Sequence, residues 1–243
     1  MKWLIASDIH GSAYWCERML ELFKREKADV LVLLGDILYH GPRNELPRDY
    51  NPKKVIALLN DFANGINDTS CTNDANGTNA TATTNGTPCE EPHRILCVRG
   101  NCDAEVDQMV LGFPIMADYG VIELGGRFAY LTHGHVYGED NPPKLKRGDI
   151  LIQGHTHMQR CVEKDGVLYL NPGSVSIPKG DGYNGCIVFD DAPQGDAQNP
   201  KHNAKQDAVQ NAALYAEMPK AGELRGIGLE KGAFRFVGLD GVL

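Results

Sequence analysis

The chain has 243 residues, of which 42% are hydrophobic, and 32 acidic side chains against 24 basic ones give it a formal net charge of -8. A chain of this length buries a sizeable core without disulfides. The acidic balance argues against nucleic acid or an anionic membrane as a general partner, so a phosphate-bearing ligand needs a local positive site such as metal ions.

The first half of the chain predicts strands and helices in alternation. Residues 3–6 are nearly all apolar, which is typical of a strand buried on both faces, and the apolar run ends at Asp8. That run is too short for a signal peptide or a bilayer span, so we expect a soluble, cytoplasmic protein. Residues 13–27 carry apolar side chains at helical spacing, and residues 28–36 supply a second buried strand. Strand, helix and strand in this order predict a parallel pair.

A second helix is predicted over residues 52–64, because proline favours the first helical turn. Two polar segments then interrupt the pattern. Residues from about 65 to 90 are mostly Asn, Thr and Gly, which indicates a surface insertion. A second insertion is predicted at about 191–222, partly helical over 204–218.

The remainder of the chain is dominated by predicted strands. A strand is expected over 95–98, hairpins about 125–126, 165–166 and 231–232, and further strands from residue 150 and over 185–190. A parallel unit followed by many strands favours two stacked sheets flanked by helices over a plain doubly wound sheet. We expect residues 1–243 to form one domain.

Side chains that bind metal ions follow several of the predicted strands. The carboxyl ends of parallel strands converge on one crevice, so we expect these residues to meet. The set has more ligands than one ion uses, but it suffices for two ions that share a carboxylate. It contains no thiolate, which disfavours a structural zinc site and favours manganese, iron or zinc in an incompletely filled catalytic site. The candidate ligands are Asp8, His10, Asp36, Asn101, His133, His155 and His157.

Six short blocks make the family resemblance specific. "DIHG", "GDI", "GNCD", "THGH" and "GHTH", in this order and followed by "NPGS", resemble the signature of the calcineurin-like metallophosphoesterases, and most closely the small YfcE-type phosphodiesterases. The resemblance implies a four-layer α-β-β-α sandwich of two mixed sheets. It also implies two divalent ions per chain, manganese first, with zinc, iron or nickel as alternatives.

The resemblance assigns roles to the ligands and to the third block. It implies that one ion is bound by Asp8, His10 and His157, that the other is bound by Asn101, His133 and His155, and that Asp36 bridges them. The candidate catalytic residues are Arg99, Asn101, Cys102 and Asp103.

Cys102, in the third block, and Arg99, directly before it, need separate comment. Many relatives carry histidine at the position of Cys102, and a neutral thiol is a poorer proton donor to a departing alkoxide than an imidazolium. Nothing beside Cys102 in the sequence resembles a dedicated base, so this residue fits a supporting group better than a nucleophile. Arg99 either steers phosphate or is an ordinary solvated charge.

The function that fits these features is hydrolysis of a small phosphate ester, most simply a diester, by a hydroxide that bridges two metal ions. A metal-binding scaffold without turnover and a phosphomonoesterase or nucleotidase remain as alternatives. We expect no stable nucleic-acid binding and no membrane association, and a homo-oligomer stays open. His135 fits a supporting role and a loop residue equally well. Asn171 and Ser174 either shape the pocket or belong to a Pro-Gly turn.

Overall fold

The computed structural model describes residues 1–66, 91–191, 226–228 and 232–240. The two predicted insertions, at about 65–90 and 191–222, lie almost entirely outside these residues, as does the helix expected over 204–218. The expectation of one domain over 1–243 stays a prediction. In the part of the chain that is described, no helix has the length and hydropathy that a membrane span requires.

The chain begins with the predicted parallel unit. β1 (Lys2–Ala6) pairs in parallel with β2 (Val30–Leu33), and α1 (Ala13–Glu26) connects them. α1 begins at Ser12, whose side chain accepts a hydrogen bond from the Trp15 amide, and ends at Lys27 in the left-handed conformation, with φ of 52°. Local capping therefore fixes both ends of the helix that follows the first strand.

The first sheet is mixed and has the order β10-β11-β9-β1-β2-β3. α2 (Pro52–Ala63) leads towards β3 (Arg94–Cys97), which is parallel to β2. β9 (Gly185–Asp190) joins β1 from the other side in antiparallel fashion. The chain then closes with the antiparallel pair β10 (Gly226–Gly228) and β11 (Ala233–Gly238).

The second sheet is also mixed, with the order β4-β5-β6-β8-β7. β5, β6 and β8 are parallel, while β4 and β7 are antiparallel at the two edges. Two of the three predicted hairpins, about 125–126 and 165–166, therefore form the edges of this sheet. Its strands are β4 (Tyr119–Leu124), β5 (Arg127–Thr132), β6 (Ile150–Ile152), β7 (Gln159–Lys164) and β8 (Val167–Pro172).

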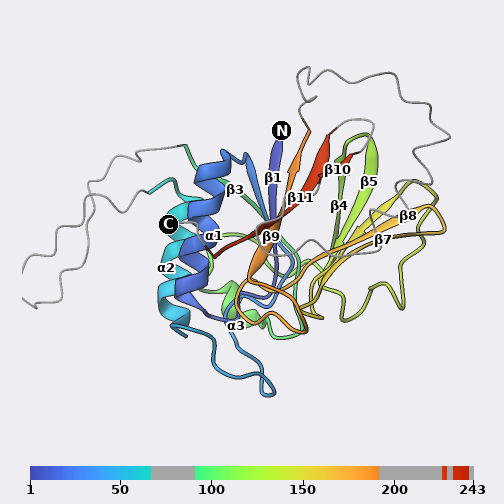
Figure 1. Cartoon of the computed structure of the whole chain (residues 1–243). Coiled ribbons are helices and arrows are strands. Elements are labelled where there is room, and N and C mark those ends of the chain that lie inside the picture. The colour runs from blue at the N-terminus through green and yellow to red at the C-terminus, as the bar shows by residue number, and fades with distance from the viewer. Residues whose placement is uncertain (67–90, 192–225, 229–231, 241–243) are drawn as a thin grey trace, which may run out of the picture.

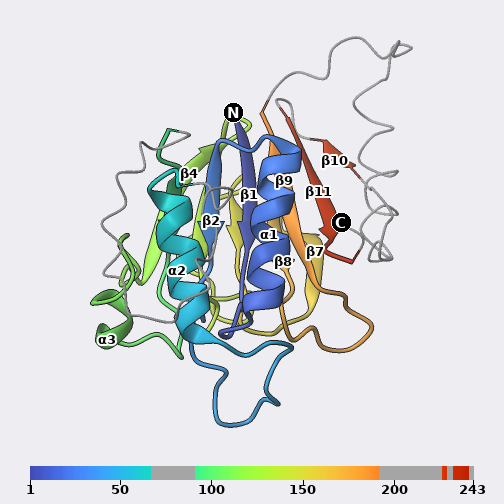
Figure 2. The same cartoon turned by 90° about the vertical axis from the view of Figure 1, so that its left-hand side faces the viewer.

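Alternation along the strands divides the core into two apolar layers. Leu4 and Leu31 pack against α1 and α2, which lie side by side on the outer face of the first sheet (Figure 2). Ile5 and Val32 face the other way and pack between the sheets (Figure 1). Two mixed sheets with helices are thus confirmed. Of the four layers expected, the described residues supply three, because none of their helices covers the outer face of the second sheet.

One short helix was not expected from the sequence. α3 (Glu105–Gln108) has a single turn and follows β3 at the end of the sheet where the parallel strands finish. Its first amide is held by the side chain of Asp107, which accepts a hydrogen bond of 2.9 Å from Ala104. This turn stabilises the chain directly after the third signature block.

Candidate metal centre

The residues that follow the parallel strands meet at one end of the two sheets, and their backbone is unusual. Asp8 and His10 follow β1, Asp36 follows β2, and His155 and His157 follow β6. All five are left-handed, with φ of 59°, 49°, 56°, 68° and 61° in that order. A non-glycine residue in this region costs about 1–3 kcal/mol, and such strain clusters at functional sites. The backbone therefore turns sharply after each of these strands, at the end of the sheets where the candidate ligands lie.

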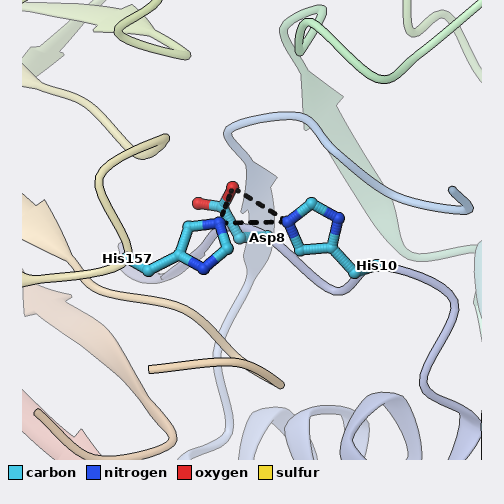
Figure 3. Close-up of side chains that lie close together, drawn as sticks. All are labelled: Asp8, His10 and His157. Atoms are coloured by element: carbon cyan, nitrogen blue, oxygen red, sulfur yellow. Dashed lines mark hydrogen bonds and ion pairs between the residues drawn. The ribbon is translucent and has the colours of Figure 1, made fainter. Parts of the chain in front are cut away.

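The first group of side chains is Asp8, His10 and His157. Asp8 is fully buried, and its Oδ1 atom lies 3.2 Å from Nε2 of His157 and 3.5 Å from Nε2 of His10. The two Nε2 atoms are 3.1 Å apart (Figure 3). Three potential ligand atoms from β1 and β6 thus surround one small volume.

The Nδ1 atoms of His10 and His157, which point away from this volume, fix the tautomer of each ring. Nδ1 of His10 donates to the carbonyl of Tyr39, and Nδ1 of His157 donates to the carbonyl of Ile177, each over 2.7 Å. A carbonyl only accepts, so each Nδ1 carries a proton, and a neutral ring presents its Nε2 lone pair to the group. Two lone pairs at hydrogen-bond distance repel each other unless a cation lies between them. Asp8 Oδ1 is buried without a hydrogen-bond partner among the described residues, so these donors fit a divalent ion.

The second group is built on Asp36, His133 and Asn101. Oδ2 of Asp36 lies 3.7 Å from Nε2 of His10, and its Oδ1 lies 3.5 Å from Nε2 of His133. His133 donates from Nδ1 to the carbonyl of Leu34 over 2.6 Å, and its Nε2 is 3.1 Å from Oδ1 of Asn101. The orientation seen for His10 and His157 is thus repeated, and Asp36 stands between the two groups.

The charges in the centre compensate one another in the protein without ions. Burial acts to raise the pKa of Asp8, but the neighbouring imidazoles of His10 and His157 outweigh it and hold this pKa well below its ordinary value. Burial acts to lower the pKa of His133, but the carboxylate of Asp36 and the charge of Asp8 raise it to about 9. A proton on His133 thus supplies part of the positive charge that metal ions would supply in a loaded centre.

His155 is placed differently from the other six candidate ligands. Its backbone amide donates to Asp8 Oδ2 over 3.0 Å, but its ring is half-buried and lies 5.1 Å from the ring of His133. The groups of close ligand atoms found among the described residues do not include it. His135 is exposed, with its ring 5.3 Å from that of His133 and 6.3 Å from that of His155. The role of His155 as a ligand stays a prediction.

Asp103 lies behind the centre and is an anchor for the backbone. Its Oδ2 accepts hydrogen bonds from the amides of Asp36 and Gly100 over 2.8 and 2.7 Å, and its Oδ1 accepts one from Ile37 over 2.9 Å. Burial, more than any other cause, raises the pKa of this carboxyl. The carboxylate therefore ties the turn after β2 to the turn after β3, and it holds Asp36 in position.

Cys102 and Arg99 occupy the rim on either side of Asn101. The amide of Cys102 donates to Asp36 Oδ1 over 2.8 Å, and its Sγ accepts from Asn101 Nδ2 over 3.3 Å. Burial and the neighbouring carboxylates raise the pKa of this thiol to about 12, so it stays protonated at neutral pH. Arg99 forms an ion pair with Asp118 over 2.6 Å, so its guanidinium already has a carboxylate partner.

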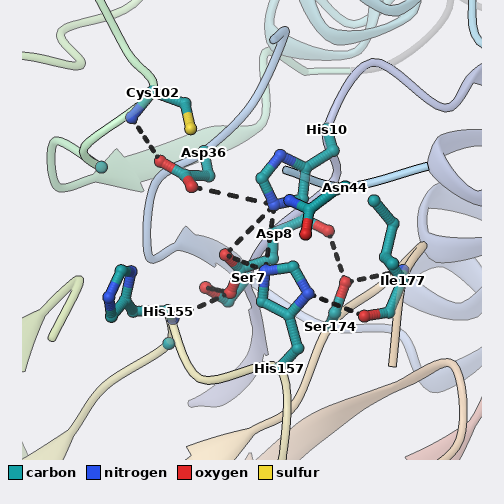
Figure 4. A network of polar contacts seen from close by, with 12 residues as sticks. Ser7, Asp8, His10, Asp36, Asn44, Cys102, His155, His157, Ser174 and Ile177 are labelled. Atoms are coloured by element: carbon teal, nitrogen blue, oxygen red, sulfur yellow. Dashed lines mark hydrogen bonds and ion pairs between the residues drawn. The ribbon is translucent and has the colours of Figure 1, made fainter. Parts of the chain in front are cut away.

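The remaining contacts brace the centre, and the sequence reasoning missed one of them. Ser7 Oγ donates to Asp8 Oδ2 over 2.6 Å; its only signal in the sequence is that it directly precedes a candidate ligand. Ser174 Oγ donates to the Asp8 carbonyl over 2.8 Å (Figure 4), and Asn171 Nδ2 donates to the Gly154 carbonyl over 2.8 Å. The "NPGS" block thus supports the backbone that carries the first group.

Comparison with known proteins also relates the chain to phosphoesterases. Residues 62–191 match the family model described as the calcineurin-like phosphoesterase superfamily domain. The chain is 44% identical over 180 residues to the phosphodiesterase YfcE of Escherichia coli (strain K12), which covers 74% of this chain and 82% of that protein. The structure of YfcE, described as a phosphoesterase from E. coli, matches with a TM-score of 0.65 at 42% identity, over 78% of this chain and 88% of that chain. The probable metallophosphoesterase YsnB of Bacillus subtilis (strain 168) is 28% identical over 99 residues, 38% of this chain and 53% of that protein.

Proposed function

This chain belongs to the calcineurin-like phosphoesterase superfamily and is a metal-dependent phosphoesterase, and from that premise we propose that it hydrolyses phosphodiesters with two divalent ions. The observation that carries the proposal is the pair of Nε2 atoms 3.1 Å apart beside the unpartnered Asp8 Oδ1. With neutral rings, two lone pairs face each other beside a carboxylate, so the three groups call for positive charge, which divalent ions would supply in a loaded centre. The side chains proposed to hold the ions are Asp8, His10 and His157 for one, Asn101, His133 and His155 for the other, and Asp36 for both.

Manganese is the ion that we propose for this centre. Carboxylate, amide and imidazole donors suit manganese, iron and zinc, whereas a thiolate ligand selects zinc or softer ions. The thiol of Cys102 lies close to His10 and Asp36, but its raised pKa of about 12 makes it a weak ligand in its protonated form. The donor set is therefore one of oxygen and nitrogen.

The residues of the centre have separate roles in the proposed reaction. When bound, divalent ions lower the pKa of a coordinated water and offset the charge of the phosphate. Asp8 and Asp36 supply the negative charge that retains the ions, and the carbonyls behind His10, His133 and His157 hold the rings in one tautomer. Asp103 keeps the Asp36 backbone fixed. The protein thus presents a site whose geometry is set before substrate arrives.

The choice of a diester rests on Cys102 and on the similarity to a phosphodiesterase. A departing oxygen needs a proton, and a thiol with a raised pKa is a poor donor at neutral pH. Esters with activated leaving groups avoid this need. We therefore propose an aryl or similarly activated phosphodiester as the easiest substrate, with a phosphomonoester as the rival distinguished by product analysis. A scaffold without turnover is disfavoured, because such a protein has no need to keep this buried and strained set of ligands.

The proposed substrate is a small molecule rather than a nucleic acid, in keeping with the net charge of -8. The five cysteines in the described part of the chain are free thiols. This supports a reducing compartment such as the cytoplasm.

An assay of bis(4-nitrophenyl) phosphate hydrolysis tests the proposal. Protein treated with a chelator should be inactive, and added manganese should restore the rate. Asp36→Asn and His157→Ala should remove most of the activity, whereas Asp149→Asn should keep it, since that buried carboxylate lies at the start of β6, away from the centre. Equal rates in all these samples would exclude a metal-dependent reaction at these residues.

A further inference from the structure

The loop between β2 and α2, which lies below the two helices in Figure 2, is tied at both ends to the turn between β1 and α1. At its start, the carbonyl of Tyr39 accepts the Nδ1 hydrogen of His10 over 2.7 Å. At its end, the carbonyls of Arg48 and Asp49 accept hydrogen bonds from the Ser12 hydroxyl and the Ala13 amide. The loop is therefore anchored on the same β1–α1 turn that carries a candidate ligand, and its side chains have a defined place relative to the centre.

Asn44 is the residue of this loop that faces the third signature block. Its Nδ2 donates to the carbonyl of His40 over 2.8 Å, which closes a tight turn around Gly41. A methyl group on Gly41, whose φ is 79°, would lie 3.3 Å from Asn44 Nδ2 and 3.4 Å from Cys102 Sγ. The amide and the thiol thus border the same small space. Figure 4 shows Asn44 in the same group of side chains as His10.

Cys102 connects this space with the candidate ligands. The Cys102 thiol forms a close group with His10 and Asp36, in which the three ligand atoms lie within 4.8 Å of one another. Cys102 thus borders both the Asn44 amide and the candidate ligands His10 and Asp36.

The amide of Asn44 has hydrogen-bonding capacity left over. One of its two N–H groups serves His40. Among the described residues, neither its Oδ1 atom nor its second N–H has a partner, and the residue is only half-buried. The bond to His40 already holds this amide in place. The amide can therefore bind a ligand through its second N–H with little further loss of side-chain freedom.

The chemistry of the reaction calls for a donor at this place. The departing oxygen of a phosphodiester gains negative charge as its bond to phosphorus breaks. Arg99, the nearby cation in the third block, is paired with Asp118. The amide of Asn101 is also engaged, since its Nδ2 donates to Cys102 Sγ and its Oδ1 faces His133.

We propose that Asn44 donates its free N–H to the departing oxygen of the phosphodiester, so that this residue contacts the substrate and sets which leaving groups the enzyme accepts. The inference rests on the proposed function and adds a residue that neither the signature blocks nor the candidate ligands include. It assigns the loop between β2 and α2 to recognition of the leaving group. The phosphate itself is left to the proposed ions.

The test compares two diesters that differ only in the departing phenol, 4-nitrophenol or unsubstituted phenol, in buffer with manganese. A donor to the departing oxygen matters more when that oxygen is more basic. Asn44→Ala should therefore lower kcat/KM by roughly 10- to 100-fold for the phenol ester and by less than about threefold for the nitrophenol ester. Asn44→Asp keeps the size of the side chain but has no N–H, so it should show the same pattern and replaces the alanine variant if that one does not fold.

Two controls separate this role from a structural one. Asn64→Ala removes a similar amide-to-carbonyl bond, of 2.9 Å to Asn60, at the end of α2, and it should leave both rates unchanged. Manganese affinity, measured by calorimetry, should stay within about twofold of the wild-type value in Asn44→Ala, because this residue is not a ligand. Equal losses on the two esters, or a fall in manganese affinity, would overturn the inference. A wild-type protein that hydrolyses neither ester would instead contradict the proposed function.

Discussion

Replacement of Asp103 tests how far the centre depends on a residue that touches no ion. Its carboxylate accepts three backbone hydrogen bonds, two at Oδ2 and one at Oδ1. Asp103→Ala leaves three buried N–H groups without an acceptor, and each such group costs about 1–3 kcal/mol. Asp103→Asn keeps one oxygen, which serves two of these groups, and loses one bond. Burial raises the pKa of Asp103, so its charged form is itself costly to bury, and removal of the charge offsets part of the lost hydrogen bonding. We therefore expect the lower end of the range for each unsatisfied group. The free energy of unfolding should fall by about 3 kcal/mol in the alanine variant and by about 1 kcal/mol in the asparagine variant.

The free energy of unfolding is measured by urea denaturation in metal-free buffer, which separates folding from metal binding. Calorimetry then gives the manganese affinity, which should fall roughly 10- to 100-fold in Asp103→Ala, as is usual when a group that orients a ligand is lost. The reasoning is refuted if the asparagine variant is as unstable as the alanine variant. It is also refuted if the alanine variant binds manganese as the wild type does.

Two substitutions and one pH titration test other features of the centre. Gly100→Ala places a Cβ against the carboxylate of Asp36 and should lower manganese affinity on titration, whereas Gly120→Ala, with no atom closer than 3.7 Å to the new Cβ, should not. Cys102→His supplies a better proton donor and should raise kcat/KM for the phenol diester by about tenfold or more relative to the nitrophenol diester; an unchanged ratio would contradict that role. In metal-free protein, the pKa of His133 is raised from 6.5 to about 9, so its contribution is complete below pH 6.5 and is lost as the pH rises through about 9. Urea midpoints should fall over this interval, and saturating manganese should remove the fall.

Much of the fold follows from local pattern. The apolar runs of β1 and β2, the helical spacing and caps of α1, and the glycines of the two hairpins in the second sheet are visible in the sequence. The convergence of the candidate ligands also follows, because parallel strands such as β5 and β6 finish at the same end of a sheet. The layer arrangement is harder to predict, since an apolar face on the outer side of a sheet can be covered by a helix or left to loops.

The sequence does not show how the centre is held in place. The carbonyls of Leu34, Tyr39 and Ile177 orient three histidines, and every residue type offers a carbonyl, so no residue type marks these positions. Asp103 was grouped with the catalytic residues because of its place in a signature block, but the three amides that it binds make it an anchor. The ring of His155 stands apart from the close ligand groups, although its backbone, with φ of 68°, is left-handed like that of His157 at 61°. Such conformations depend on the whole fold and leave no local signal.

Anomalous diffraction at the manganese edge, from crystals grown with manganese, tests the central claim most directly. We predict two peaks on either side of the Asp36 carboxylate, one of them within reach of Asp8, His10 and His157, and the other within reach of Asn101 and His133. A single peak, or peaks away from these side chains, would contradict a two-ion centre for phosphodiester hydrolysis.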